Sequence, residues 1–244
     1  MRQRIRMNRY GASKSGRLMA RYLGIKMLSL SNSRFRGRAT DVVINWGNGK
    51  GNVGNARQIN KLSNVQLASN KLHTLEALKA NDVPVPYFST YKESFAPVDT
   101  LYGRSTLYGH SGIGIYVGTK DEIPDCPLYV EAIDKEAEYR VIVVGDEVAD
   151  FKQKLKRSNY EGTHGEHVWN HGSGYVFVRE SIQSAPIGVG KLGVDAVKAL
   201  GLDFGAVDII EDSDGRLFVL EVNTAFGIEG QTLNLVGDKL KELI

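Results

Sequence analysis

Two apolar segments near the C-terminus have the length and composition of buried β-strands. Residues 205–211 and 217–222 are rich in Val, Ile and Leu, and the β-branched residues among them favour strands. The sequence Asp-Ser-Asp-Gly at 212–215 separates the two segments and predicts a tight turn. The three segments together predict a β-hairpin.

The hydrophobic pattern predicts a mixture of strands and helices in the rest of the chain. Leu72, Leu75 and Leu78 recur at helical spacing after a Ser-Asn cap, and Pro84 and Pro86 enforce an extended exit. Strands are expected at 5–8, 26–30, 41–45, 128–133, 138–144, 147–155 and 174–179, and helices at 15–23, 69–80, 190–200 and 233–243. This order predicts an α/β (α+β) protein with a small N-terminal α/β lobe, a β-rich middle and a larger C-terminal lobe.

The composition is that of an ordinary globular protein. The chain has 244 residues, of which 42% are hydrophobic and 24% charged, so it suits one large domain or two to three small lobes. No apolar run approaches the roughly 18–20 residues of a membrane span, and the first six residues include three arginines, so we expect no membrane association and no secretion. Cys126 is the only cysteine, which excludes a disulfide framework and fits a cytoplasmic location.

Positive charge is concentrated before the first acidic residue, Asp41, although the net charge is only +3. The basic residues of this block are Arg2, Arg4, Arg6, Arg9, Lys14, Arg17, Arg21, Lys26, Arg34, Arg36 and Arg38. Such a block suits an anionic partner, which would be a nucleic acid, an acidic peptide or a carboxylate substrate. The alternative is a solvated face with no partner.

The predicted hairpin brings three oxygen ligands together. Asp208 lies opposite Glu221 and Asn223, which share a face of their strand because side chains repeat every two residues. Two carboxylates and one amide oxygen are hard ligands, which suit Mg²⁺ that phosphates also bind. An acidic hairpin end in solvent is the alternative interpretation.

A glycine-rich segment in the middle of the chain is a candidate phosphate loop. Residues 109–114 read Gly-His-Ser-Gly-Ile-Gly between two strand-like segments, and their backbone N–H groups could cover phosphates. Arg104 lies just upstream and could reach the same anion. Glycine-rich hairpin tips are also common without a ligand.

Charged residues recur on the strands that follow. Glu131 lies in an extended segment whose backbone groups suit hydrogen bonds with an adenine edge. Glu138 and Arg140 share a face of the next strand and offer a ribose acceptor and a cation for phosphate. The strand after it has a cationic stripe of alternating residues, Lys152, Lys154 and Lys156. A charged outer face of an edge strand is the alternative.

These features occur in an order that resembles the ATP-grasp superfamily. The chain looks most like the carboxylate–amine ligases that include α-L-glutamate ligases, glutathione synthetases and D-alanine–D-alanine ligases. The resemblance runs from about Ser69 to Phe226, and its most specific part is Asp208 with Glu221-x-Asn223. It implies an N-terminal lobe at 1–68, a linker helix and lid at 69–128, and a C-terminal subdomain at 129–244, with ATP between the last two.

The resemblance also implies roles for individual residues. Nucleotide phosphates would contact Lys71, Arg104, His110, Ser111 and Gly112, adenine would lie against Glu131, Ala132 and Ile133, and the ribose would bind Glu138. Two Mg²⁺ ions, with Mn²⁺ as an alternative, would be held by Asp208, Glu221 and Asn223. The catalytic residues would be Arg140, Lys154 and Asn170. Arg104 departs from the family, which usually has a lysine there, and arginine does not reproduce the point charge of lysine.

The implied reaction is ATP-dependent formation of an amide through an acyl phosphate, with an amino acid, peptide or protein as the acceptor. Two other classes remain open: an ATP-grasp kinase that forms no amide, and a nucleic-acid-associated protein that uses the basic N-terminus. Residues 164–171 contain three of the five histidines, so a zinc site is an alternative to the substrate-side loop that the resemblance implies there.

Overall fold

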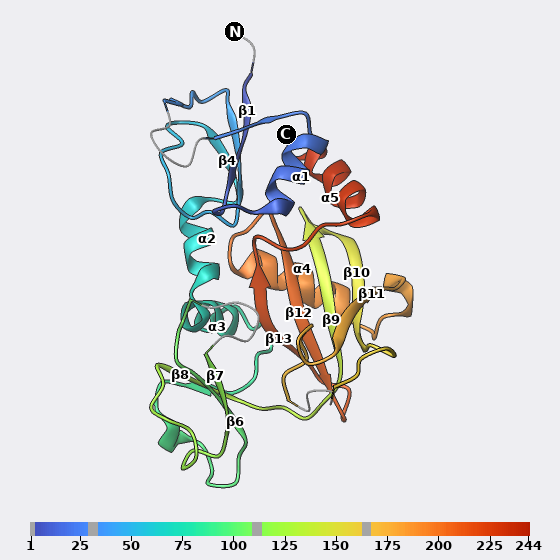
Figure 1. Ribbon diagram of the computed structural model, residues 1–244. Coiled ribbons are helices and arrows are strands. Elements are labelled where there is room, and N and C mark those ends of the chain that lie inside the picture. The colour runs from blue at the N-terminus through green and yellow to red at the C-terminus, as the bar shows by residue number, and fades with distance from the viewer. Residues whose placement is uncertain (1–2, 29–33, 109–113, 163–166) are drawn as a thin grey trace.

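The computed structural model describes residues 3–28, 34–108, 114–162 and 167–244 of the chain (Figure 1). In these ranges the strands form three sheets of four, five and four strands. The N-terminal sheet, the five-stranded central sheet and the lid sheet correspond to the three parts expected from the sequence. The expected division at residues 68 and 128 stays a prediction.

The N-terminal lobe is a small parallel sheet in the order β2-β1-β3-β4. Its elements are β1 (Ile5–Arg9), α1 (Lys14–Tyr22), β2 (Lys26–Met27), β3 (Val42–Trp46) and β4 (Arg57–Ile59). The sequence did not predict β4 or the helix α2 (Leu62–Ser69) that follows it. Only Ile59 is buried in β4, so the alternation of buried and exposed residues cannot be recognised in its sequence. Its parallel pairing with β3, across the loop of residues 47–56, decides its conformation.

The central sheet is antiparallel, in the order β11-β10-β9-β12-β13. Its strands are β9 (Lys135–Val144), β10 (Glu147–Lys156), β11 (Tyr175–Arg179), β12 (Phe204–Asp212) and β13 (Leu217–Asn223). The helix α4 (Val189–Ala199) covers one face. Gly193 of this helix allows the close approach, because a Cβ atom there would lie 2.6 Å from Val141 Cγ1. The predicted hairpin is present, and its register pairs Asp208 with Glu221.

The lid is a four-stranded sheet in the order β5-β8-β6-β7. Its strands are β5 (Phe88–Ser89), β6 (Leu101–Arg104), β7 (Ile115–Gly118) and β8 (Leu128–Glu131), and a short 3₁₀ helix covers Lys92–Ser94. The helices α2 and α3 (Lys71–Ala80) connect the N-terminal lobe to the lid. The expected strand at 128–133 ends at Glu131 and pairs with β5 and β6.

The N-terminal lobe packs on one end of the central sheet. Trp46 of β3 stacks on Phe204 at 5.2 Å and contacts Phe226 at 4.9 Å between ring centroids. The C-terminal helix α5 (Gln231–Glu242) lies beside α1 (Figure 1). A Cβ atom on Gly47 would lie 2.2 Å from Ala225 Cβ, so the loop after β3 directly meets the loop after β13. In the described part of the chain, no helix is long and apolar enough to cross a membrane.

Candidate active site

A cleft of about 880 Å³ lies between the lid and the central sheet. It is lined by most of the residues singled out in the sequence: Lys71, Arg104, Glu131, Ile133, Glu138, Arg140, Lys154, Asn170, Asp208, Glu221 and Asn223. Ala132 is not among the lining residues, and its backbone N–H donates to the Thr100 carbonyl at 2.9 Å. His110, Ser111 and Gly112 lie outside the described residues.

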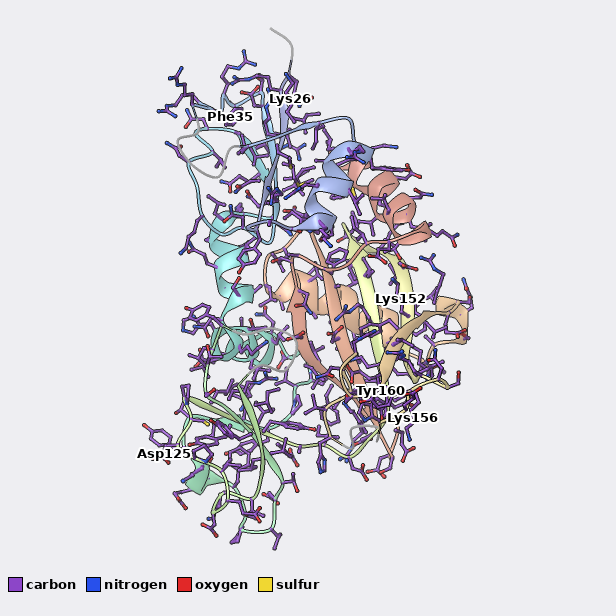
Figure 2. All side chains as sticks on the ribbon, in the orientation of Figure 1. Lys26, Phe35, Asp125, Lys152, Lys156 and Tyr160 are labelled. Carbon is purple, nitrogen blue, oxygen red and sulfur yellow. The ribbon has the colours of Figure 1, made fainter. Side chains whose placement is uncertain are left out.

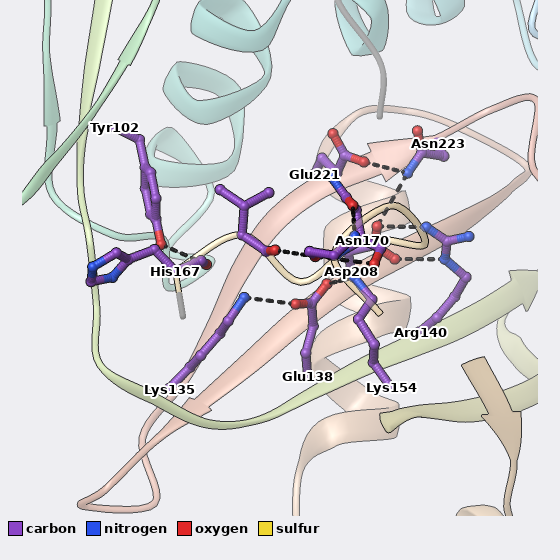
Figure 3. A network of polar contacts seen from close by, with 12 residues as sticks. Tyr102, Lys135, Glu138, Arg140, Lys154, His167, Asn170, Asp208, Glu221 and Asn223 are labelled. Atoms are coloured by element: carbon purple, nitrogen blue, oxygen red, sulfur yellow. Dashed lines mark hydrogen bonds and ion pairs between the residues drawn. The ribbon is translucent and has the colours of Figure 1, made fainter. Parts of the chain in front are cut away.

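The hairpin positions the predicted metal ligands at the centre of this cleft (Figure 3). Arg140 donates two hydrogen bonds to Asp208, from Nε at 2.6 Å and from Nη2 at 2.7 Å. Asn223 Nδ2 donates to Glu221 Oε1 at 2.9 Å and lies 3.5 Å from Asp208 Oδ2. This amide orientation leaves the Asn223 Oδ1 atom available as a ligand.

Lys71 joins the same cluster from the first turn of α3. The Asn70 side chain caps this helix by accepting hydrogen bonds from the N–H groups of Leu72 and His73. Lys71 Nζ then reaches Glu221 Oε2 at 2.8 Å. Burial alone would raise the pKa of Glu221, but Lys71, Asn223 and Arg104 together outweigh it and lower this pKa to about 2. Glu221 is therefore a carboxylate at neutral pH.

Glu138 is buried and is paired with two lysines. Lys135 Nζ donates to its Oε2 at 2.9 Å, and Lys154 Nζ donates to its Oε1. Lys135 was not predicted as a site residue, because residues 135 and 138 point to opposite faces of a regular strand. A register shift in the pairing of β9 with β12, near Glu211 and Asp212, puts the two side chains together.

Aromatic rings form the wall of the cleft on the β11 side. Arg140 lies over the Phe177 ring at 4.1 Å and Lys154 lies over it at 4.7 Å, measured to the centroid. Trp169 stacks on Tyr175 with centroids 4.8 Å apart and 7° between the planes. Phe177 was not predicted from the sequence as a site residue. In the sequence this residue belongs to an apolar strand segment, and the structure pairs that strand with the strand that carries the lysine stripe.

The loop after β10 closes the cleft on the side of the lid. Tyr102 of the lid donates from its hydroxyl to the His167 carbonyl at 2.9 Å (Figure 3). Asn170 lines the cleft, but its Oδ1 atom accepts the Ser173 N–H at 2.8 Å, so the side-chain oxygen holds the turn. Among the described residues, no three or more His, Cys, Asp or Glu side chains lie together so that they could hold a metal ion. The zinc site considered around His171 therefore has no structural support in this part of the chain.

Apolar side chains from the lid and from the central sheet also line the cleft. Ile115 and Val130 of the lid and Ile210 and Leu220 of the central sheet line it. Ile133 follows β8, and its backbone N–H donates to no described residue. An apolar slot beside a backbone donor suits a flat heteroaromatic ring.

The donor set at the hairpin fits a magnesium ion. Two carboxylates and the Asn223 side-chain amide meet there, and carboxylate and amide oxygens are the hard ligands that Mg²⁺ prefers when phosphates supply the rest. Burial raises the pKa of Asp208 even though Arg140 donates two hydrogen bonds to it. A cation beside Asp208 would therefore stabilise its carboxylate form.

Known proteins resemble this chain in sequence and in fold. No family model matches the chain. The chain is 30% identical over 189 residues to a protein of Shewanella sp. (strain W3-18-1) named "Probable alpha-L-glutamate ligase 1", an alignment that covers 72% of this chain and 58% of the relative. The chain thus spans a little more than half the length of this curated relative.

Solved structures resemble almost the whole chain, and two of them illustrate this. The ATP-grasp ligase PsnB, complexed with a phosphomimetic variant of its minimal precursor, Mg and ADP, has a TM-score of 0.66 at 14% identity and covers 99% of both chains. D-alanine–D-alanine ligase from Bacillus anthracis has a TM-score of 0.62 at 12% identity, covering 99% of this chain and 98% of the other. These similarities confirm the fold that the sequence predicts.

Proposed function

We propose that the chain is an ATP-grasp enzyme, an ADP-forming ligase that joins a carboxylate to an amine. The observation that supports this most is the cleft in which Asp208, Glu221 and Asn223 meet four cations on Lys71, Arg104, Arg140 and Lys154. Hard oxygen ligands next to excess cations suit a metal-bound triphosphate.

The chemistry requires positioning and charge neutralisation from the protein. A substrate carboxylate oxygen attacks the γ-phosphorus of ATP, and ADP leaves as an acyl phosphate forms. The amine nitrogen then attacks the acyl carbon, phosphate leaves, and the nitrogen loses a proton. Lys71, Arg104 and Lys154 would neutralise the phosphates, and Arg140 would orient Asp208. Mg²⁺, bound by Asp208, Glu221 and Asn223, would supply further charge neutralisation.

The nucleotide base would lie against the apolar side chains that line the cleft. Ile115, Val130, Ile210 and Leu220 would enclose its faces, and the backbone of Ile133 would recognise its edge. The Glu138 carboxylate would accept a hydrogen bond from a ribose hydroxyl. In the structure Lys135 and Lys154 both form ion pairs with the Glu138 carboxylate. A ribose hydroxyl bound to this carboxylate would release one of the lysines, which could then contact phosphate.

The acceptor would be an amino acid or a peptide. The relative named as a glutamate ligase supports an amino acid, and the precursor bound to PsnB supports a peptide. A kinase of the same fold is the second candidate. The two reactions differ in product, because a ligase releases phosphate with a new amide, whereas a kinase leaves a stable phosphorylated product.

Several finer expectations belong to this proposal. Two metal ions, the use of Mn²⁺ and a cytoplasmic location stay predictions. An anionic partner at the basic N-terminus also stays a prediction, and Arg4 and Arg38 of that block are engaged with Asp41.

Calorimetric titration of ATP into the protein, with and without Mg²⁺, tests the proposal. We expect saturable binding that depends on Mg²⁺ and that the Glu221→Ala variant loses. Glu147→Ala is the matched control, because this carboxylate lies on the same sheet but pairs with Lys239 at the surface, outside the cleft. Absence of nucleotide binding by folded wild-type protein would overturn the enzyme proposal.

A further inference from the structure

One row of side chains crosses all five strands of the central sheet. The register pairs Arg179 with Lys152, Lys152 with Arg140, Arg140 with Asp208, and Asp208 with Glu221. From β11 to β13 the row therefore reads Arg-Lys-Arg-Asp-Glu. Arg140, Asp208 and Glu221 belong to the cleft, while the two cations on β10 and β11 have no part in the proposed reaction.

Three adjacent cations in one row are unfavourable by themselves. Like charges directly opposite each other on neighbouring strands repel, at a side-chain separation of roughly 5 Å. Arg140 donates two hydrogen bonds to Asp208, which neutralises its charge. Lys152 remains, and the register places it between two arginines. Such an arrangement is expected where an anion from outside the chain binds.

Lys152 has the weakest polar contacts of the five residues in the row. Its side chain is only 18% exposed, and its closest carboxylate atom is Asp150 Oδ2 at 3.8 Å. Its ammonium group donates no hydrogen bond to any described residue. Burial lowers the pKa of Lys152; Arg179 and Arg140 lower it further, while Asp150 and the exposed Glu229 act in the opposite direction. The ammonium group thus retains donors for a ligand.

Arg179 is fixed rather than free. Its Nη2 atom donates to Asp150 Oδ2 at 2.9 Å and to Thr232 Oγ1 at 2.8 Å, and Thr232 donates to the same carboxylate oxygen at 2.7 Å. Asp150 and Thr232 are almost fully buried, whereas the Arg179 side chain is 31% exposed. The buried network therefore holds a solvent-accessible guanidinium group beside Lys152.

We propose that Lys152 and Arg179 bind a second anionic group of the acid substrate, separate from the carboxylate that reacts. This inference rests on the proposed function, and it adds that the reacting carboxylate lies near Arg140 and the acidic end of the row. One strand spacing from there, Lys152 would meet an anion about 5 Å away. The preferred substrates are then dicarboxylates, or peptides whose second acid lies a few bonds from the reacting one.

Glutarate and its half-amide, 5-amino-5-oxopentanoate, test this proposal because they match in length and differ by one charge. Their affinities would be measured by calorimetry with Mg²⁺ and a non-hydrolysable ATP analogue bound. Wild type is expected to bind glutarate about tenfold more tightly than the half-amide, which is one good charged hydrogen bond. Lys152→Gln should remove this difference, and Lys152→Arg should restore most of it.

Lys156→Gln is the matched control, since Lys156 lies on the same strand and is exposed beyond the row (Figure 2). Lys152 is chosen over Arg179 because loss of Arg179 would leave buried Asp150 without its guanidinium partner. Equal affinities of wild type for the two acids, an unchanged preference in Lys152→Gln, or no glutarate binding while the analogue binds would overturn this inference alone. Failure of the analogue itself to bind would overturn the proposed function as well.

Discussion

Two clusters of acidic and basic side chains in this molecule contain the same residue types but differ in what they can bind. In the N-terminal lobe, Asp41 accepts hydrogen bonds from Arg4 and Arg38, with the closest contact at 2.6 Å from Arg4 Nη2. The backbone N–H groups of Arg4 and Arg38 also donate to this carboxylate. In the cleft, Asp208 and Glu221 pair with Arg140 and Lys71 at similar distances.

The two clusters differ in how many of their oxygen atoms remain available for a ligand. Both oxygens of Asp41 are fully used, its side chain has no exposed surface, and the hydrogen bonds from Arg4 and Arg38 hold its pKa well below the usual range. The cleft cluster instead borders a cavity of about 880 Å³, and among the described residues none donates a hydrogen bond to Asn223 Oδ1. A closed cluster stabilises the fold, whereas an open one with spare ligands suits a bound metal and nucleotide.

The largest expected effect is on nucleotide binding when the open cluster loses a charge. Asp208→Asn should weaken binding of ATP in the presence of Mg²⁺ by about 100-fold, roughly 2.7 kcal/mol, because a metal-binding carboxylate becomes neutral. The Tm should fall only slightly, since burial already disfavours this charge. Calorimetry gives the affinity and thermal unfolding gives the Tm. A variant that binds Mg²⁺-ATP normally would refute the metal site.

The closed cluster should respond in the opposite way. Asp41→Asn removes the charge that Arg4 and Arg38 share, and unpaired cations in a tight cluster are destabilising. We expect the Tm to fall by roughly 5–10 °C and the affinity for Mg²⁺-ATP to stay unchanged at a temperature where the variant is folded. If nucleotide binding were lost as strongly as in Asp208→Asn, the two clusters would not be separate in function.

A smaller effect should follow from changing the shape of a cation while keeping its charge. Arg140→Lys loses one of two parallel hydrogen bonds to Asp208, and lysine does not replace a bidentate guanidinium group. The dissociation constant for Mg²⁺-ATP should rise about three- to tenfold. Arg38→Lys, in the closed cluster, is the control and should leave this constant unchanged. Equal constants for wild type and Arg140→Lys would show that the paired geometry has no role in binding.

The smallest effect is the pH dependence of stability at Glu221. Its pKa in the folded protein is about 2, below the 4.5 of an unperturbed glutamate, so its ion pair with Lys71 contributes stability above pH 4.5. This contribution is lost as the pH falls from 4.5 toward 2. Without Mg²⁺, wild type should unfold a few degrees above Glu221→Gln at pH 7, and this difference should shrink below pH 4.5. A difference that grew in acid would contradict the assigned pKa.

Much of this site was readable from local sequence. The Val- and Ile-rich hairpin with its Asp-Ser-Asp-Gly turn determines that Asp208 lies opposite Glu221, because strand periodicity and turn chemistry are local properties. The helix cap at Asn70 likewise predicts that Lys71 begins a helix. Lys135 was missed because a register shift, which depends on pairing with a distant strand, changes the face to which it points.

The sequence by itself determined the elements, their order and the residue types available for binding a metal and phosphates. Only the tertiary structure decided which cations pair with which acids. Arg4 and Arg140 are alike in sequence character, yet one closes a buried cluster in the N-terminal lobe and the other borders an open cleft. The physical reason is that ion pairing, burial and cross-strand register are set by contacts between segments far apart in the chain, which no local pattern encodes.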